Sequence, residues 1–95
     1  MNAPNFELPA SSPESSSRPR VLLVDDNKAF RLAALELLKD MDEIEVCGEA
    51  QDAASAMEQV RALHPTLVIT DITLPDEDGL YIANRTRELS PQTIV

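Results

Sequence analysis

Short apolar runs that end in acidic residues are the feature that most constrains the fold of this chain. Residues 21–24 read Val-Leu-Leu-Val and lead into Asp25 and Asp26, and residues 67–70 read Leu-Val-Ile-Thr and lead into Asp71. Uninterrupted apolar runs of this length indicate strands that are buried on both faces, as in a parallel sheet. Two further strands are expected at residues 45–50 and from residue 93 onward.

Helical spacing separates these strands. Between residues 28 and 41 the apolar positions follow a helical period and predict one amphipathic face: Phe30, Ala33, Ala34, Leu37, Leu38 and Met41. Asp52 is expected to cap a second helix that ends before Pro65, and a third helix is expected from about residue 80 to 89, before Pro91. Strands that alternate with helices predict an α/β fold, with an open parallel sheet and helices on both faces.

The first 19 residues differ in composition from the rest. They contain Pro4, Pro9, Pro13 and Pro19 and a serine run at 15–17, and few apolar residues. Such a segment cannot bury enough apolar surface to offset its conformational entropy, so we expect a disordered leader at 1–19. Residues 20–95 are expected to form one small domain.

Charge and composition exclude several classes of function. The net charge of −9 and the aromatic content of 3% argue against direct nucleic-acid binding by this segment. Cys47 is the one cysteine, which excludes a disulfide framework and a thiolate metal site, and we expect it to be a small buried residue. No apolar stretch approaches the ~20 residues of a membrane span, and we expect no secretory signal before the domain. The expected compartment is the cytoplasm.

The acids that follow the strands form a candidate site. The carboxyl ends of parallel strands share one edge of a sheet, so Asp25, Asp26 and Asp71 are predicted to converge if their strands are neighbours. Crowded carboxylates repel one another, and a hard divalent cation such as Mg²⁺ or Mn²⁺ relieves that repulsion. A carboxylate beside such a cation can also act as a nucleophile. A single acid after a strand more often caps the next helix, but acids after two strands favour a metal site.

At these residues the sequence resembles a response-regulator receiver domain, the family of the chemotaxis regulator CheY. The matching motifs are the segments 21–27, 48–50 and 67–80, in the family's order and spacing. The resemblance implies a three-layer flavodoxin-like fold around an open parallel sheet with strand order 2-1-3-4. This sheet is expected to be incomplete, because the sequence is truncated before the family's fifth strand. Segment 48–50 and the Ser90-Pro91 pair also resemble the subclass with LuxR-type output domains, which implies transcription regulation.

The resemblance also implies roles for individual residues. Asp71 would accept a phosphoryl group from a sensor histidine kinase with the help of Mg²⁺, with Mn²⁺ as a substitute. Asp26 would bind the metal directly, Asp25 through water, and Thr73 through its backbone carbonyl. The side chains of Thr73 and Asn27 either tune the lifetime of the phosphoryl group or form ordinary loop and cap hydrogen bonds. Pro75 and Gly79 are expected to shape the loop after Asp71.

The chain also departs from the family pattern. The Ser or Thr that ends the family's fourth strand and the Lys that ends its fifth are absent from these 95 residues, and Lys28 does not replace that lysine. Thr86 stands where the family has an apolar residue, and His64 is expected to be an ordinary helix-end residue. We expect the open sheet to permit a homodimer or other association.

Two alternatives follow from these departures and from the acid pattern. The first is a phosphorylation-independent or inactive pseudo-receiver that acts as an interaction module. The second is a phosphatase of the haloacid-dehalogenase type, which requires Asp-x-Asp after its first strand, whereas Asp25 and Asp26 are adjacent. On the leading interpretation the chain is a signalling module and not a turnover enzyme.

Overall fold

A parallel sheet of three strands forms the centre of the computed structural model, which describes residues 18–95. The strands are β1 (Arg20–Val24), β2 (Glu45–Ala50) and β3 (Leu67–Thr70), and their order across the sheet is β2-β1-β3. β1 therefore lies between its two neighbours and pairs in parallel with both. This order brings the carboxyl ends of β1 and β3 to adjacent positions on one edge of the sheet.

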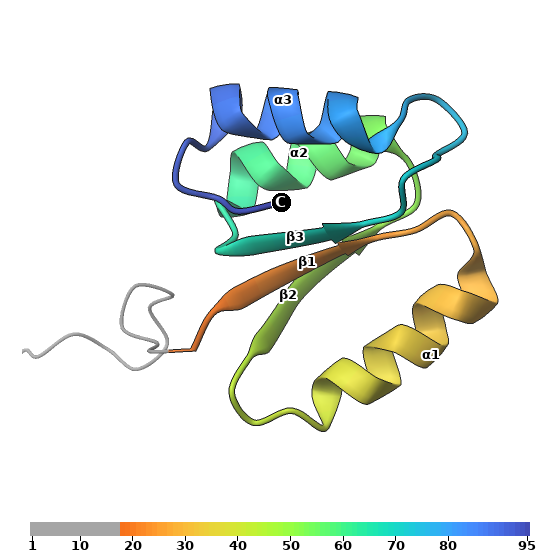
Figure 1. The fold of residues 1–95 in the computed structure, drawn as a ribbon. Coiled ribbons are helices and arrows are strands. Elements are labelled where there is room, and N and C mark those ends of the chain that lie inside the picture. The colour runs from red at the N-terminus through yellow and green to blue at the C-terminus, as the bar shows by residue number, and fades with distance from the viewer. Residues whose placement is uncertain (1–17) are drawn as a thin grey trace, which may run out of the picture.

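Helices cover both faces of the sheet. α1 (Lys28–Lys39) lies on one face, and α2 (Ala53–Leu63) and α3 (Gly79–Leu89) lie on the other (Figure 1). The predicted three-layer α/β architecture is confirmed. The fourth strand expected from residue 93 consists of a single parallel bridge from Ile94 to Leu67, on the edge of β3 that does not pair with β1.

The core lies mainly between the sheet and the α2–α3 layer. Its residues are aliphatic, as the low aromatic content requires, and are contributed by β1, β2, β3, α2, α3 and the loop before α3: Leu22, Val24, Ala50, Ala53, Ala56, Met57, Val60, Val68, Leu74 and Ile82. Because β1 is central, all its residues from Val21 to Val24 are buried. This burial explains why its sequence is apolar without alternation.

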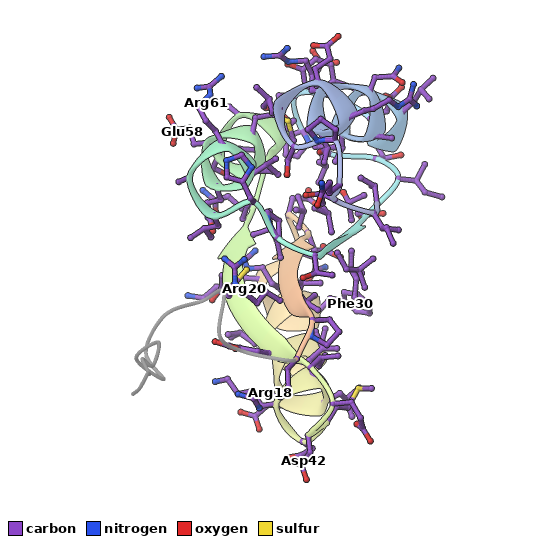
Figure 2. The ribbon with its side chains drawn as sticks, turned by 90° about the vertical axis from the view of Figure 1, so that its left-hand side faces the viewer. Arg18, Arg20, Phe30, Asp42, Glu58 and Arg61 are labelled. Atoms are coloured by element: carbon purple, nitrogen blue, oxygen red, sulfur yellow. The ribbon has the colours of Figure 1, made fainter. Side chains whose placement is uncertain are left out.

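The apolar face predicted for α1 is only partly correct, because Ala34 and Leu38 are half-buried but other members of it are exposed. Leu35 is the buried residue of this helix, whereas Phe30 is 61% exposed (Figure 2) and Leu37 is 71% exposed. α1 carries apolar residues around much of its circumference, so its period does not select one face. Contact with β1 and β2 determines which side is buried.

Apolar side chains are also exposed beside the outer edge of β3 and near the C-terminal end of the chain: Ile69, Ile72, Leu80, Ile94 and Val95. Association through this surface stays a prediction. Within the described range, no helix combines the length and apolarity that crossing a membrane requires. The leader predicted at 1–19 falls mostly on residues 1–17, which lie outside the described residues.

Both ends of α2 are held by polar contacts. Asp52 is the N-cap, as predicted, and its carboxylate accepts the Ser55 N–H at 2.8 Å. His64 ends the helix in the left-handed conformation, with φ of 45°, so its expected place at a helix end is confirmed. From β1, the Arg20 guanidinium (Figure 2) donates to the carbonyls of Leu63 and His64 at 2.7 and 3.3 Å. A cation there also complements the negative end of the helix dipole.

Candidate metal centre

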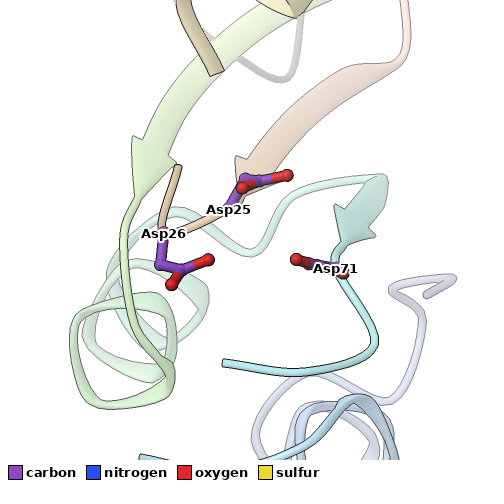
Figure 3. A group of neighbouring side chains, drawn as sticks. All are labelled: Asp25, Asp26 and Asp71. Atoms are coloured by element: carbon purple, nitrogen blue, oxygen red, sulfur yellow. The ribbon is translucent and has the colours of Figure 1, made fainter. Parts of the chain in front are cut away.

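Three carboxylates meet at the carboxyl edge of the sheet. Asp25 and Asp26 follow β1 and Asp71 follows β3, and their side chains face a common space (Figure 3). One carboxylate oxygen from each residue lies within 4.8 Å of the others. The predicted convergence of these acids, which are 45 residues apart along the chain between Asp26 and Asp71, is present in the structure.

The sheet itself positions the two acid-bearing segments. The Asp25 N–H donates to the Ala50 carbonyl at 3.0 Å, and the Asp71 N–H donates to the Val24 carbonyl at 3.0 Å. These bonds extend the parallel ladders by one residue beyond the ends of the strands. The backbones that carry Asp25 and Asp71 are therefore fixed relative to each other before any ligand binds.

The three carboxylates differ in exposure. Asp25 is 7% exposed, and its Oδ1 accepts the Asn27 N–H at 2.9 Å. Its second oxygen is not used by that bond. Asp26 and Asp71 are exposed. Asp25 is thus buried and held by a hydrogen bond, whereas Asp26 and Asp71 are accessible from solvent.

The donor set fits a hard divalent cation. Two unit charges about 4 Å apart repel by about 1 kcal/mol even in water, and by more at a partly buried position. A cation held between the three carboxylates would turn this repulsion into attraction. Oxygen-only ligands are those that Mg²⁺ and Mn²⁺ prefer, so the residues present suit either ion.

The backbone around Thr73 leaves its carbonyl available. Thr73 forms an isolated antiparallel bridge with Asp78, and the hydrogen bonds of this bridge run from Gly79 N–H to Ile72 and from Leu74 N–H to Glu77. In a pair of this type, the N–H and the carbonyl of the bridged residue point away from the partner segment. The Thr73 carbonyl is therefore not consumed by the loop's own hydrogen bonds.

Comparison with known proteins identifies the domain. The model of the response regulator receiver domain matches residues 21–95. The chain belongs to this receiver family. The protein-glutamate methylesterase/protein-glutamine glutaminase 1 of Methanospirillum hungatei is 36% identical to the receiver over 78 residues, and its counterpart in Hydrogenovibrio crunogenus is 38% identical over 79 residues. These matches cover 80% and 83% of this chain but 23% and 21% of the two relatives.

Solved receiver structures share the fold. The signal receiver domain of NarL from Mycobacterium tuberculosis superposes with a TM-score of 0.77 at 30% identity, over 83% of this chain and 64% of that one. The response regulator domain of CheB from Thermotoga maritima gives 0.75 at 26% identity, over 81% and 57%. A LuxR-family regulator from Aurantimonas gives 0.76 at 30% identity, over 82% and 56%. Because methylesterase and LuxR-family regulators both resemble this receiver, LuxR-type output stays a prediction.

Local hydrogen bonds account for several residues singled out in the sequence. Asn27 is the N-cap of α1, and its Oδ1 accepts the Phe30 N–H at 2.9 Å. Lys28 is exposed at the start of the same helix. Gly79 does not have a positive φ; a side chain there would crowd the Ile72 Cα, at 3.3 Å, because the loop closes tightly at this point. Close backbone approach, rather than a left-handed turn, therefore favours glycine at this position.

Two residues that make contacts near the centre, Arg31 and Asp76, were missed by the sequence analysis. Arg31 donates to the Asp25 carbonyl at 2.7 Å and pairs with the Glu49 carboxylate at 2.7 Å. These contacts link α1 to the end of β1 and to β2. Asp76 accepts the N–H groups of Ala53 and Ala54 at 2.9 and 3.0 Å. Arg31 and Glu49 are 18 residues apart, and Asp76 is 22 and 23 residues from its two partners, so no local spacing signals these pairs.

Proposed function

We propose that this receiver accepts a phosphoryl group on Asp71 in two-component signal transduction. The observation that carries the proposal is the exposed Asp71 carboxylate, which lies within 4.8 Å of the Asp25 and Asp26 oxygens at the carboxyl edge of the sheet. Membership of the receiver family supports the same assignment. The phosphodonor would be the phosphohistidine of a sensor histidine kinase in the cytoplasm.

The neighbouring residues would hold the divalent cation for this reaction. Asp26 would be a direct ligand, Asp71 a second, and the Thr73 carbonyl a third, with Asp25 acting through water. When bound, Mg²⁺ supplies positive charge that offsets the charge of the transferring phosphoryl oxygens. The Asn27 N–H holds the Asp25 carboxylate in place, so Asp25 would present an already oriented oxygen to a water bound to the cation.

Phosphoryl transfer would conserve atoms and charge as follows. An electron pair of an Asp71 carboxylate oxygen forms the new P–O bond. The P–N bond of the phosphohistidine breaks, and its electron pair stays on the imidazole nitrogen, which takes up a proton from solvent. The exposure of Asp71 supports this step, because a donor side chain must approach the carboxylate from solvent.

The output of the whole protein lies outside this domain. The chain spans about a fifth of the length of the methylesterase relatives that it matches. The receiver would act as a signalling module whose phosphorylation controls an attached or separate effector. It would not itself be a turnover enzyme.

A small acyl phosphate and Mg²⁺ provide the decisive test. The wild-type chain should gain the mass of one phosphoryl group, and Asp71→Asn should gain none. Glu77→Gln is the matched control, because it removes one carboxylate from the same exposed loop and should still be phosphorylated.

Two other outcomes would contradict the proposal and favour a different function. Continuous release of inorganic phosphate, with no lasting adduct, would indicate a phosphatase. A folded wild-type chain without any adduct would indicate an interaction module that is independent of phosphorylation.

A further inference from the structure

The N-terminal turn of α2 has two carboxylate caps instead of one. Asp52, the local N-cap, accepts the Ser55 N–H through its side chain and the Ala56 N–H through its carbonyl, at 2.8 and 3.0 Å. Asp76, from the loop before α3, accepts the remaining two N–H groups, those of Ala53 and Ala54. The Ala56 bond is the first hydrogen bond within the helix, and the two carboxylates satisfy the three N–H groups of the first turn that have no acceptor within it, those of Ala53, Ala54 and Ser55.

The second cap uses both oxygens of its carboxylate. Each Asp76 oxygen accepts a different N–H, so the carboxylate is held at two points against the positive end of the helix dipole. The Ala53 N–H, followed by the Ala54 N–H, lowers the pKa of Asp76 despite the opposing effect of desolvation. The contact therefore joins two segments through an ionised group and not only through packing.

The loop that Asp76 anchors also carries Thr73. Within residues 72–79 the Gly79–Ile72 and Leu74–Glu77 hydrogen bonds, at 2.6 and 3.0 Å, close the segment on itself. Leu74 is buried in the core and fixes the base of this loop. Asp76 fixes its tip. The Thr73–Asp78 bridge and these hydrogen bonds link the position of the Thr73 backbone to that of the loop tip.

We propose that Asp76 is a positioning residue for the metal centre, because it holds the loop 72–79 against α2 and thereby fixes the Thr73 carbonyl relative to Asp25 and Asp71. The inference rests on the proposed function, since it concerns the cation that these residues would bind. Asp76 itself would not contact the cation or the phosphoryl group.

Mn²⁺ binding, measured by electron paramagnetic resonance on the folded chain, tests the proposal. Asp76→Asn keeps one acceptor oxygen but turns an amide N–H₂ toward the helix donors, so it should weaken Mn²⁺ binding about tenfold, as is common for residues that orient metal ligands. Glu77→Gln removes the same charge from the same loop and should change the dissociation constant less than about twofold. Asp76→Glu should recover part of the loss.

Hydrogen exchange in the metal-free chain provides a second measurement. The Leu74 N–H, which donates within the loop, should exchange faster in Asp76→Asn than in Glu77→Gln. Ala53→Pro removes one donor to Asp76 without a change of charge. Proline is tolerated at the first position of a helix, and Asp52 before it is already extended, with φ of −151°. This variant should weaken Mn²⁺ binding in the same direction.

The outcomes separate the two proposals. A folded wild-type chain that binds no Mn²⁺ would overturn the proposed function, and this inference with it. A wild-type chain that binds Mn²⁺, with Asp76→Asn indistinguishable from Glu77→Gln, would overturn the inference alone. Urea unfolding of each variant identifies any loss that comes from global unfolding, because a purely stabilising role would lower the midpoint and leave Mn²⁺ binding by the folded fraction unchanged.

Discussion

At the scale of single residues, two threonine hydroxyls near the α2–α3 layer are in opposite situations. Thr86 is 0% exposed, and its Oγ1 has no hydrogen-bond partner among the described residues. The Thr93 Oγ1 donates to the Pro65 carbonyl at 2.5 Å and contacts the Ser90 Oγ at 2.6 Å. Burial of the Thr86 hydroxyl lowers stability because it has lost its water partners, whereas hydrogen bonds within the protein compensate the Thr93 hydroxyl.

Thr86→Val should therefore stabilise the chain. Valine has nearly the same shape and removes a hydroxyl that lost its water partners on folding, so the free energy of unfolding should rise by about 1 kcal/mol. Urea denaturation measures the change. The matched variant Thr93→Val removes a hydroxyl that has partners and should lower the free energy of unfolding. Equal effects of the two substitutions would contradict this account of Thr86.

The carboxylate of Asp76 should make stability depend on pH in a defined window. Its pKa in the folded chain lies below the ordinary value of 3.8, because the Ala53 and Ala54 N–H groups favour the ionised form. A group whose pKa falls on folding contributes stability above its unfolded pKa and loses this contribution as the pH falls through its folded pKa. The stability difference between the wild type and Asp76→Asn should be constant above about pH 5 and shrink below 3.8. A difference that grows on acidification would contradict this assignment.

At the scale of secondary-structure elements, local caps set where the helices begin. Asn27, Asp52 and Asp78 each accept the N–H of the residue three positions later. Asp52→Ala should lower the free energy of unfolding by about 1 kcal/mol, the usual cost of losing such a cap. Asp42→Ala, in the exposed turn before β2, is the control and should have little effect. Circular dichroism during urea titration measures both.

The helix α1 illustrates the limit of periodicity. Its sequence predicted a face that included Phe30 and Leu37, yet both are exposed and Leu35 is buried. Spacing within a helix indicates which residues share a side. It does not indicate which side packs against a sheet when several sides are apolar.

At the scale of the whole molecule, the clustered acids should couple metal binding to stability. A ligand that binds only the folded state adds RT ln(1 + [L]/Kd), which is about 1.4 kcal/mol at ten times Kd. Mg²⁺ should therefore raise the urea midpoint of the wild-type chain. The increase should be smaller in Asp26→Asn and unchanged in Asp42→Ala. A cooperative transition that is insensitive to Mg²⁺ would contradict a metal site at Asp25, Asp26 and Asp71.

The sequence alone was sufficient for the features that depend on neighbouring residues or on one general rule. Apolar runs identified β1 and β3, a strand was also expected at the position of β2, and Asp52 was recognised as a cap because its partner is three residues away. The acid cluster was also predictable, because the carboxyl ends of adjacent parallel strands must share an edge. Family resemblance then supplied the candidate roles of these acids.

Only the tertiary structure decided the contacts between segments that are distant in the chain. The bonds from Ala53 and Ala54 to Asp76, the Arg31–Glu49 pair and the buried face of α1 all depend on where separate elements come to rest. No spacing rule encodes such distances, since they result from the packing of the whole core. The sequence thus determined which carboxylates lie at the carboxyl edge of the sheet. Packing determined which distant contacts hold the segments around them in place.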